Sequence, residues 1–327
     1  NSIGAEGIAR SQRQARLTIL LAAVMWSTSA LFAKANFFHA WPIDGFLPQR
    51  GLLLVFWRAV FATLVLAPLV RRPRWTWKLI PAGLIFLAMN VTYLSAMVRT
   101  SAANAIWLQN TAPLWVFLVG TTLLGDPVDR RDWLQLACIA AGLGVIFAFE
   151  LRGGQPTGVL WGVAAGATYA GVVLSLRWLR TEDSAWLVAF NHGFTALALA
   201  PYVASTGVWP AGWQWPLLVA FGMLQMGLPY LLFARGLRWL AAHEAAGIVL
   251  LEPLLVPLWA LVWNDRPAWW TLAGGGLIFI GLVSRYLRAA GKPTRPPDAP
   301  LSGDHAATSL LDKPAVPPEA GKPTQRP

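Results

Sequence analysis

The sequence predicts an all-α integral membrane protein with ten transmembrane helices, arranged as two inverted five-helix repeats. Three observations support this fold class: the apolar composition, the long intervals without charge, and a residue pattern that recurs in the second half of the chain. Apolar residues form 56% of the 327 residues and charged residues only 13%, whereas a soluble domain carries about 25% charged residues. The core of one soluble domain cannot bury so much apolar surface, so we expect much of that surface to face membrane lipid.

The composition also excludes several other classes of protein. The 19 Trp and 15 Phe residues need burial, which excludes a disordered body. Cys138 is the only cysteine, which excludes a disulfide scaffold, and the few Cys and His residues lead us to expect no metal and no cofactor. The net charge of +11 could suggest nucleic acid. However, the basic residues are scattered over many loops, so we expect no nucleic-acid partner.

Long intervals without charge predict the individual spans. Between Lys78 and Asp126 the only charge is Arg99, and between Asp183 and Arg235 there is none. A hydrocarbon core of ~30 Å needs ~20 apolar residues per helix, so each interval holds two spans. The runs are continuously apolar, without the alternation of a β-barrel. The same reasoning along the chain predicts ten spans, at about residues 17–36, 51–70, 79–98, 103–124, 133–150, 157–177, 184–204, 215–234, 245–263 and 268–287.

The positions of Lys and Arg predict the orientation in the membrane. With the N-terminus inside, fifteen Lys and Arg residues flank the spans on the inner side, against four in the outer loops, Arg50, Arg99, Arg152 and Arg266. The positive-inside rule therefore predicts a multi-pass protein of the cell (inner or plasma) membrane with both termini in the cytoplasm.

The two ends of the chain differ in composition from the spans. Residues 1–16 are polar and basic, which predicts a cytosolic N-terminal segment. Residues 290–327 are rich in Pro and lack an apolar period, which predicts a disordered cytosolic tail. The arginines before the first apolar run would also fit a cleaved signal peptide, but the run that Lys34 closes is long enough to span a membrane.

A pattern in spans four and five recurs in spans nine and ten. A run of small residues precedes Pro113 and another precedes Pro253, and an acid ends each span, Asp126 and Asp265. Five spans per half is an odd number, so the second copy enters the membrane from the opposite side. Secondary transporters use such inverted repeats for alternating access, whereas chance similarity among Leu/Ala-rich helices is the alternative. The two predicted repeats cover residues 17–150 and 151–289.

An ordered set of short motifs runs through the spans. They are Trp26-Ser27, Lys34, Arg58, the run Thr100 to Ala105 with Gln109-Asn110 and Pro113, Leu123-Leu124-Gly125-Asp126, and Leu250-Leu251-Glu252-Pro253. Together they resemble the EamA-like ten-helix branch of the drug/metabolite transporter superfamily over about residues 17–288. The chain departs from that family in having Asp126 and Asp265 where the family usually has Glu. The resemblance implies export or exchange of small metabolites, commonly amino acids, without ATP.

Two charged residues within spans are candidates for coupling or for a structural role. Glu252 lies mid-span before Pro253, which frees backbone carbonyls. Its carboxyl could load and release a proton, which would make the proton the coupling ion. Alternatively, Arg58 or helix-end donors hold Glu252 as a structural carboxyl. Arg58 itself could bind a substrate carboxylate, or it could snorkel or hold span two to a neighbour.

A second set of candidates is neutral and would line a substrate cavity through weak contacts. They are Trp26, Asn90, Tyr93, Gln109, Asn110, Tyr169, Gln225 and Tyr230. Asn90 and Tyr93 are three residues apart and share a helical face. Trp26 and Tyr169 hold corresponding places in spans one and six and could flank a flat apolar ligand. The alternative is polar contacts between helices, worth only ~0.6–2 kcal/mol each. We interpret His192 as a buried imidazole with its hydrogen bonds satisfied.

These features predict a secondary transporter that exports small metabolites such as amino acids, with membrane lipid as its surroundings. A multidrug exporter of lipophilic cations is the second hypothesis, which an inward-facing Arg58 would oppose. An integral-membrane transferase is the third, because Asp126 and Asp129 come closest to a pair of acidic metal ligands. Arg130 and Arg131 follow them directly and indicate pairing in a solvated loop instead. We therefore expect no enzyme activity.

Overall fold

The computed structural model describes residues 2–45, 48–70, 73–123, 132–153, 156–179, 182–237, 239–240 and 242–289. Every regular element in these residues is a helix. Residues 1–290 form one compact unit, which is the part described below. The predicted tail from 290 to 327, and Asp126 with the neighbouring Asp129, Arg130 and Arg131, lie outside the described residues.

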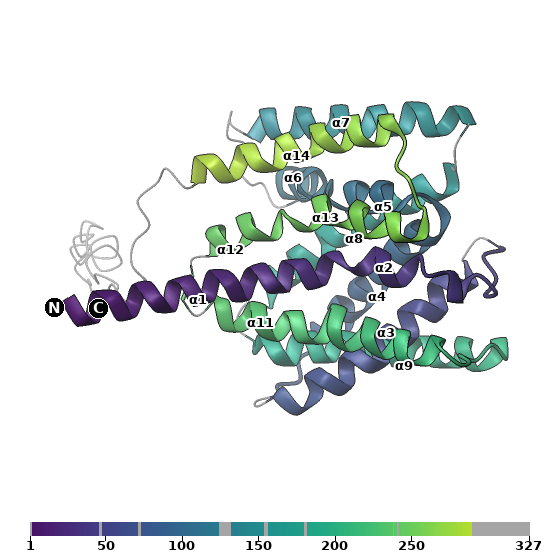
Figure 1. Cartoon of the computed structure of the whole chain (residues 1–327), viewed down its shortest axis with the longest axis horizontal. Coiled ribbons are helices and arrows are strands. Elements are labelled where there is room, and N and C mark those ends of the chain that lie inside the picture. Colours follow the sequence, from purple (N-terminus) through teal and green to yellow (C-terminus); the bar gives the residue numbers. More distant parts are fainter. Residues whose placement is uncertain are drawn as a thin grey trace, which may run out of the picture. The chain divides into compact units, whose positions relative to one another are not determined.

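The apolar runs of the sequence form helices in both halves of the chain (Figure 1). The first half contains α1 (Ser2–Ser27), α2 (Ser29–Ala33), η1 (Asn36–Phe38), α3 (Gln49–Leu66), η2 (Ala67–Leu69), α4 (Leu79–Arg99), α5 (Ala102–Gln109), α6 (Ala112–Leu123) and α7 (Asp132–Gly153). The second half contains α8 (Pro156–Trp178), α9 (Ser184–Thr206), α10 (Gln214–Ala220), the π-helix η3 (Phe221–Gly227), α11 (Leu228–Gly236), α12 (Ala242–Val249), α13 (Glu252–Ala260), η4 (Leu261–Trp263) and α14 (Trp269–Ala289).

Seven helical stretches of the described residues are long and apolar enough to cross a membrane. They are Ser11–Ala33, Gln49–Leu69, Leu79–Arg99, Trp133–Arg152, Pro156–Trp178, Ser184–Thr206 and Gln214–Gly236. Gly247–Trp263 and Trp269–Ser284 are shorter apolar helices. The chain is therefore a multi-pass membrane protein, as predicted. Helical structure overlaps each of the ten predicted spans, and α1 extends the first of them to Ser2 through the segment that we expected to precede it.

Polar and glycine residues at the helix ends explain where several helices begin or end. The Ser101 hydroxyl accepts a hydrogen bond from the Asn104 N–H at 3.1 Å and so caps α5. Asp183 caps α9 by accepting from the Ala185 N–H at 2.8 Å. At the other end of α9, Gly207 has a left-handed φ of 64°, which glycine adopts without steric cost.

Two of the predicted spans are divided at a proline, in addition to the first span, where Thr28 separates α1 from α2. We expected residues 103–124 and 245–263 to be continuous, but the structure separates α5 from α6 and α12 from α13. The reason is proline, whose ring clashes with the carbonyl four residues earlier. The residue four positions before Pro113 is Gln109, which ends α5, and the residue four positions before Pro253 is Val249, which ends α12. The two divided spans meet, because α5 packs against α13.

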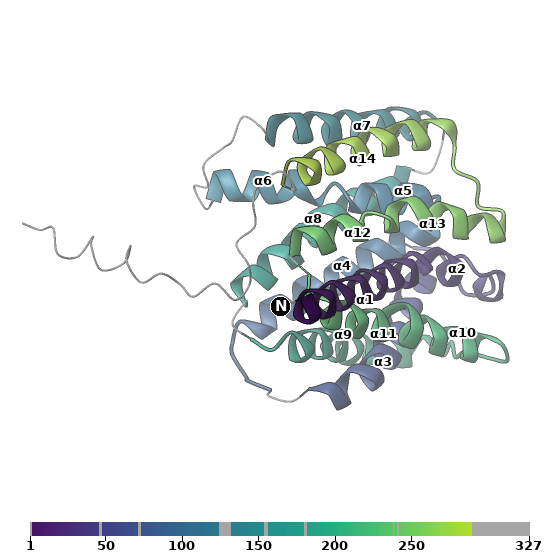
Figure 2. The ribbon, with the colours of Figure 1, turned by 60° about the vertical axis from the view of Figure 1, so that its left-hand side comes forward.

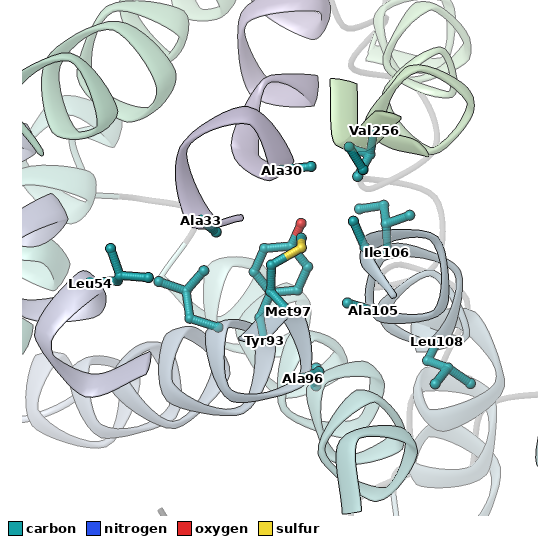
Figure 3. Packing of buried hydrophobic residues seen from close by; sticks show 14 of the residues in the cluster. Ala30, Ala33, Leu54, Tyr93, Ala96, Met97, Ala105, Ile106, Leu108 and Val256 are labelled. Atoms are coloured by element: carbon teal, nitrogen blue, oxygen red, sulfur yellow. The ribbon is translucent and has the colours of Figure 1, made fainter. Parts of the chain in front are cut away.

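Helix pairs from opposite halves of the chain make the most extensive contacts. α4 packs along α8, α7 along α14 and α3 along α9, and Figures 1 and 2 both show α7 beside α14. Glycine permits this closeness, because a Cβ on Gly142 of α7 would lie only 2.4 Å from the Gly274 carbonyl oxygen of α14. The largest buried apolar cluster lies where α2, α3, α4, α5 and α13 converge (Figure 3).

Candidate substrate site

The centre of the site is the guanidinium of Arg58 on α3. Its side chain is buried, with 2% of the residue exposed, and Nη2 donates a hydrogen bond to Oδ1 of Asn90 on α4. The helix backbone orients the Asn90 side chain, because Nδ2 donates a hydrogen bond to the Phe86 carbonyl one turn earlier in α4, at 2.9 Å. The guanidinium carbon also lies 5.0 Å from the ring centre of Phe221, a cation–π contact. The contacts of the cation are therefore with neutral groups, and it forms no ion pair with any residue that the structure describes.

Tyr93 extends the polar face of α4 by one turn. Its hydroxyl and the Ser29 hydroxyl of α2 are 3.0 Å apart and share a hydrogen bond. Both residues are buried, as Asn90 is. Asn90 and Tyr93 thus face the same interior region, as their spacing predicted. Figure 3 shows the Tyr93 side chain between α2 and α5.

A π-helix presents the next polar group. η3 packs closely against α3 because Gly222 has no side chain: a Cβ there would lie 2.7 Å from the Arg58 carbonyl oxygen. Within η3, Gln225 is buried and its Nε2 donates to the Trp26 carbonyl at 3.0 Å. Its Oε1 has no hydrogen-bond partner among the described residues. π-Helical turns occur frequently at functional sites, so this local geometry supports a role for Gln225.

Aromatic side chains form the next part of the site. Trp26 of α1 meets Tyr230 of α11 edge to face, with ring centres 5.1 Å apart. The His192 ring of α9 lies 6.2 Å from Tyr230 and 4.9 Å from Phe86. We expected His192 to have its hydrogen bonds satisfied, but its buried Nε2 has no partner in the described part of the chain. The rings of Phe86 and Tyr230, which lie beside His192, offer its imidazole aromatic contacts in place of a hydrogen-bond partner.

Glu252 begins α13 at the division between α12 and α13. The residue is partly exposed, and its carboxylate forms neither a hydrogen bond nor an ion pair with any described residue. The structural alternative, a Glu252–Arg58 ion pair, is therefore not present. The helix that Glu252 begins packs against α1, α2 and α5. Arg58 and Glu252 thus lie on different helices without neutralising each other directly.

Three further predicted residues lie on α8 or at the end of α5. Gln109, at the end of α5, points its Nε2 at the Met89 sulfur, 3.5 Å away. Asn110 donates from Nδ2 to the Ile106 carbonyl of its own helix at 2.9 Å and so stabilises the end of α5. Tyr169 is 38% exposed on α8, unlike the buried residues around Arg58. The contacts of the site therefore join Arg58 to Asn90, and Gln225 and Tyr230 to Trp26. Tyr93 lies one turn from Asn90, and Glu252 lies at the start of α13.

Sequence reasoning missed a second buried polar group. Glu150 of α7 is 7% exposed, and its Oε1 accepts from Asn104 Nδ2 at 2.8 Å and from Trp270 Nε1 at 3.1 Å. Thr271 donates to the Asn104 Oδ1 at 2.8 Å and completes a link between α5, α7 and α14. The sequence signal for this group is an acid at the end of an apolar run. We interpreted Glu150 only as the last residue of the predicted span 133–150.

A buried set of charged, polar and aromatic side chains inside a bundle of membrane-length helices is typical of membrane transport proteins. The profile of the EamA-like transporter family matches this chain twice, over residues 14–148 and 156–286. The chain belongs to that family, and the resemblance to the drug/metabolite transporter superfamily is confirmed.

Several transporters are similar to this chain in sequence. A protein of Archaeoglobus fulgidus named "Uncharacterized transporter" is 26% identical over 282 residues, which cover 84% of this chain and 97% of that protein. "Uncharacterized transporter YwfM" of Bacillus subtilis is 24% identical over 278 residues, covering 82% and 92%. A solved crystal structure with 22% identity superposes with a TM-score of 0.58, covering 86% of this chain and 100% of that one, which shows a shared fold.

Proposed function

We propose that this protein is a secondary transporter that exports small metabolites with a carboxylate, such as amino acids and related compounds, by alternating access. The observation that carries the proposal is the buried Arg58 guanidinium, which is hydrogen-bonded to the neutral Asn90. A guanidinium has five N–H donors and can take a carboxylate bidentately. A buried cation held by neutral groups is costly until a counter-charge arrives, and a substrate carboxylate supplies one.

Two internal repeats support alternating access. The family profile matches each half of the chain separately. The helix contacts also correspond between halves: α4 packs on α8 as α11 packs on α1, and α5 packs on α8 as α12 packs on α1. In this proposal the halves, residues 17–150 and 151–289, are inverted five-span repeats around a shared central site. The excess of inner Lys and Arg supports a location in the cell membrane with both termini in the cytoplasm.

Glu252 is the proposed coupling residue. Its carboxylate lies where α12 and α13 separate, is partly exposed, and is unpaired within the described residues. Discontinuous helices are where secondary transporters bind substrates and coupling ions. A carboxyl in this position can accept a proton in one orientation of the carrier and release it in the other.

A multidrug exporter of lipophilic cations is the second candidate. The aromatic group of Trp26, Tyr230 and Phe233 favours it, because aromatic rings bind flat cations and Glu252 could supply the negative charge. Arg58 opposes it, because a buried guanidinium repels a second positive charge in a medium of low dielectric constant.

Exchange assays in proteoliposomes test the proposal. Liposomes loaded with one amino acid are exposed to a labelled panel, with lipophilic cations as competitors. We expect Arg58→Gln to lower carboxylate exchange strongly, whereas Arg152→Gln, which removes an exposed cation at the end of α7, leaves it unchanged. Glu252→Gln should keep exchange and lose accumulation driven by a pH gradient. Unchanged exchange in Arg58→Gln, or competition by cations alone, would contradict the carboxylate proposal.

A further inference from the structure

We propose that Lys34 and Asp265 form a lock that keeps one end of the bundle closed, and that this lock opens when substrate leaves at that end. The proposed topology places this end outside the cell. The inference rests on the proposed alternating access and adds to it the contact that one of its two conformations has to break.

One carboxylate oxygen connects three segments of the chain. Asp265 Oδ2 lies 3.2 Å from the Lys34 ammonium and accepts a hydrogen bond from the Ala102 N–H at 2.8 Å. The same ammonium donates to the Thr100 carbonyl at 2.6 Å. Lys34 caps the C-terminal end of α2, Thr100 ends α4 and Ala102 begins α5. The acid thus also meets the positive end of the α5 dipole.

The lock joins the two halves of the chain. Lys34, Thr100 and Ala102 belong to the first predicted repeat, and Asp265 belongs to the second. If the halves move against each other to expose the central site at this end, these contacts have to separate. The separation would also free the start of α5, a helix that packs against α13.

An apolar seal lies next to the lock. Ala33 and Ala35, on either side of Lys34, are buried in the same cluster as Ala102. Figure 3 shows Ala33 with Met97 and Ile106 in this cluster. Apolar packing of this kind is non-directional, so it can re-form in more than one register. The directional ion pair and its two hydrogen bonds therefore define the closed arrangement.

The opposite end of the same two spans offers a matched comparison. Arg16 of α1 pairs with Glu244 of α12 at 2.5 Å, but their side chains are 55% and 36% exposed. The Lys34 and Asp265 side chains are 17% and 18% exposed. Solvent screens the first pair far more than the second, and exposed ion pairs contribute little. Only the shielded pair is expected to bias the conformational equilibrium.

The test measures access to the central site without any substrate. Cys138→Ser removes the only cysteine of the chain, and Ser29→Cys places a reporter beside Tyr93, at a position that is 1% exposed. The rate of labelling by a membrane-impermeant maleimide is measured from the outer face of intact cells. We expect Lys34→Met and Asp265→Asn each to raise this rate roughly tenfold, equivalent to about 1.4 kcal/mol. The double variant should label no faster than either single one, because both remove the same contact.

Matched variants separate a lock from general loosening. Lys34→Arg keeps the ion pair and should label slowly, as should Arg16→Met and Glu244→Gln at the opposite end, with thermal unfolding measured for every variant. The lock is overturned if Lys34→Met and Asp265→Asn label at the parent rate, if Arg16→Met accelerates labelling equally, or if the gain occurs only from the cytoplasmic face. Failure of amino acid exchange would overturn the proposed function but leave this result standing, because labelling needs no substrate.

Discussion

Replacing Gly222 with alanine tests whether the close approach of η3 to α3 positions Arg58. The new Cβ would lie 2.4 Å from the Phe61 Cβ and 2.7 Å from the Arg58 carbonyl oxygen. Both distances are far below van der Waals contact, and neither neighbouring atom can rotate away without moving α3. Inserting a group into a packed interior costs typically about 1–3 kcal/mol. We therefore expect Gly222→Ala to destabilise the protein by roughly that amount.

Gly144→Ala and Gly276→Ala provide the comparison, because a Cβ at either position meets nothing within 4 Å. Alanine there should leave stability unchanged or raise it by up to about 1 kcal/mol through helix propensity. Thermal unfolding in one detergent, followed by the loss of monodisperse protein, measures all three variants, and amino acid exchange measures the effect on Arg58. Equal stability of Gly222→Ala and Gly144→Ala would refute the reasoning, since it would mean that the two helices are not in tight contact.

Three further predictions concern single contacts. Asp183→Ala should cost about 0.5–2 kcal/mol because it removes the cap of α9, whereas Asp183→Asn keeps an acceptor and should unfold near the parent temperature. Tyr93→Phe removes the hydrogen bond to Ser29 and should cost about 0.6–2 kcal/mol, and no change in unfolding would argue against that bond. Desolvation, followed by the charges of nearby cations, lowers the pKa of His39 below its ordinary value of 6.5. The folded state therefore disfavours protonation, so a small part of stability should be lost as pH falls below 6.5, and thermal unfolding of His39→Gln should lack this part.

Most helix positions could be predicted from the sequence because charges bound the apolar runs, whereas the extension of α1 to Ser2 could not. The prediction of 79–98 corresponds to α4, Leu79–Arg99, since Lys78 and Arg99 bound its apolar run. The divisions of α5 from α6 and of α12 from α13 follow from Pro113 and Pro253. Applying the rule that proline disrupts the turn four residues before it would have predicted both.

The contacts of the site were less predictable, because they depend on how distant helices pack. Arg58 and Asn90 are 32 residues apart, and no periodicity within either span indicates that they meet. For the same reason the sequence left open whether Arg58 holds Glu252, because the charges alone do not show which residues face each other. The shared face of Asn90 and Tyr93 was predictable because it depends on the geometry of one helix only.

The π-helical turn in η3 gives span eight one residue more than an α-helical register would contain. Removing a single residue between Phe221 and Gly227 would return this stretch to ordinary α-helix and rotate the side chains on one side of it by about 100° relative to the other. If the residue removed is Met226 or Gly227, Gln225 and Tyr230 lie on either side of the change, so their common approach to Trp26 would be lost while the helix itself persisted. Insertion or deletion of one residue at this turn could thus change the substrate specificity of a related protein without changing its fold.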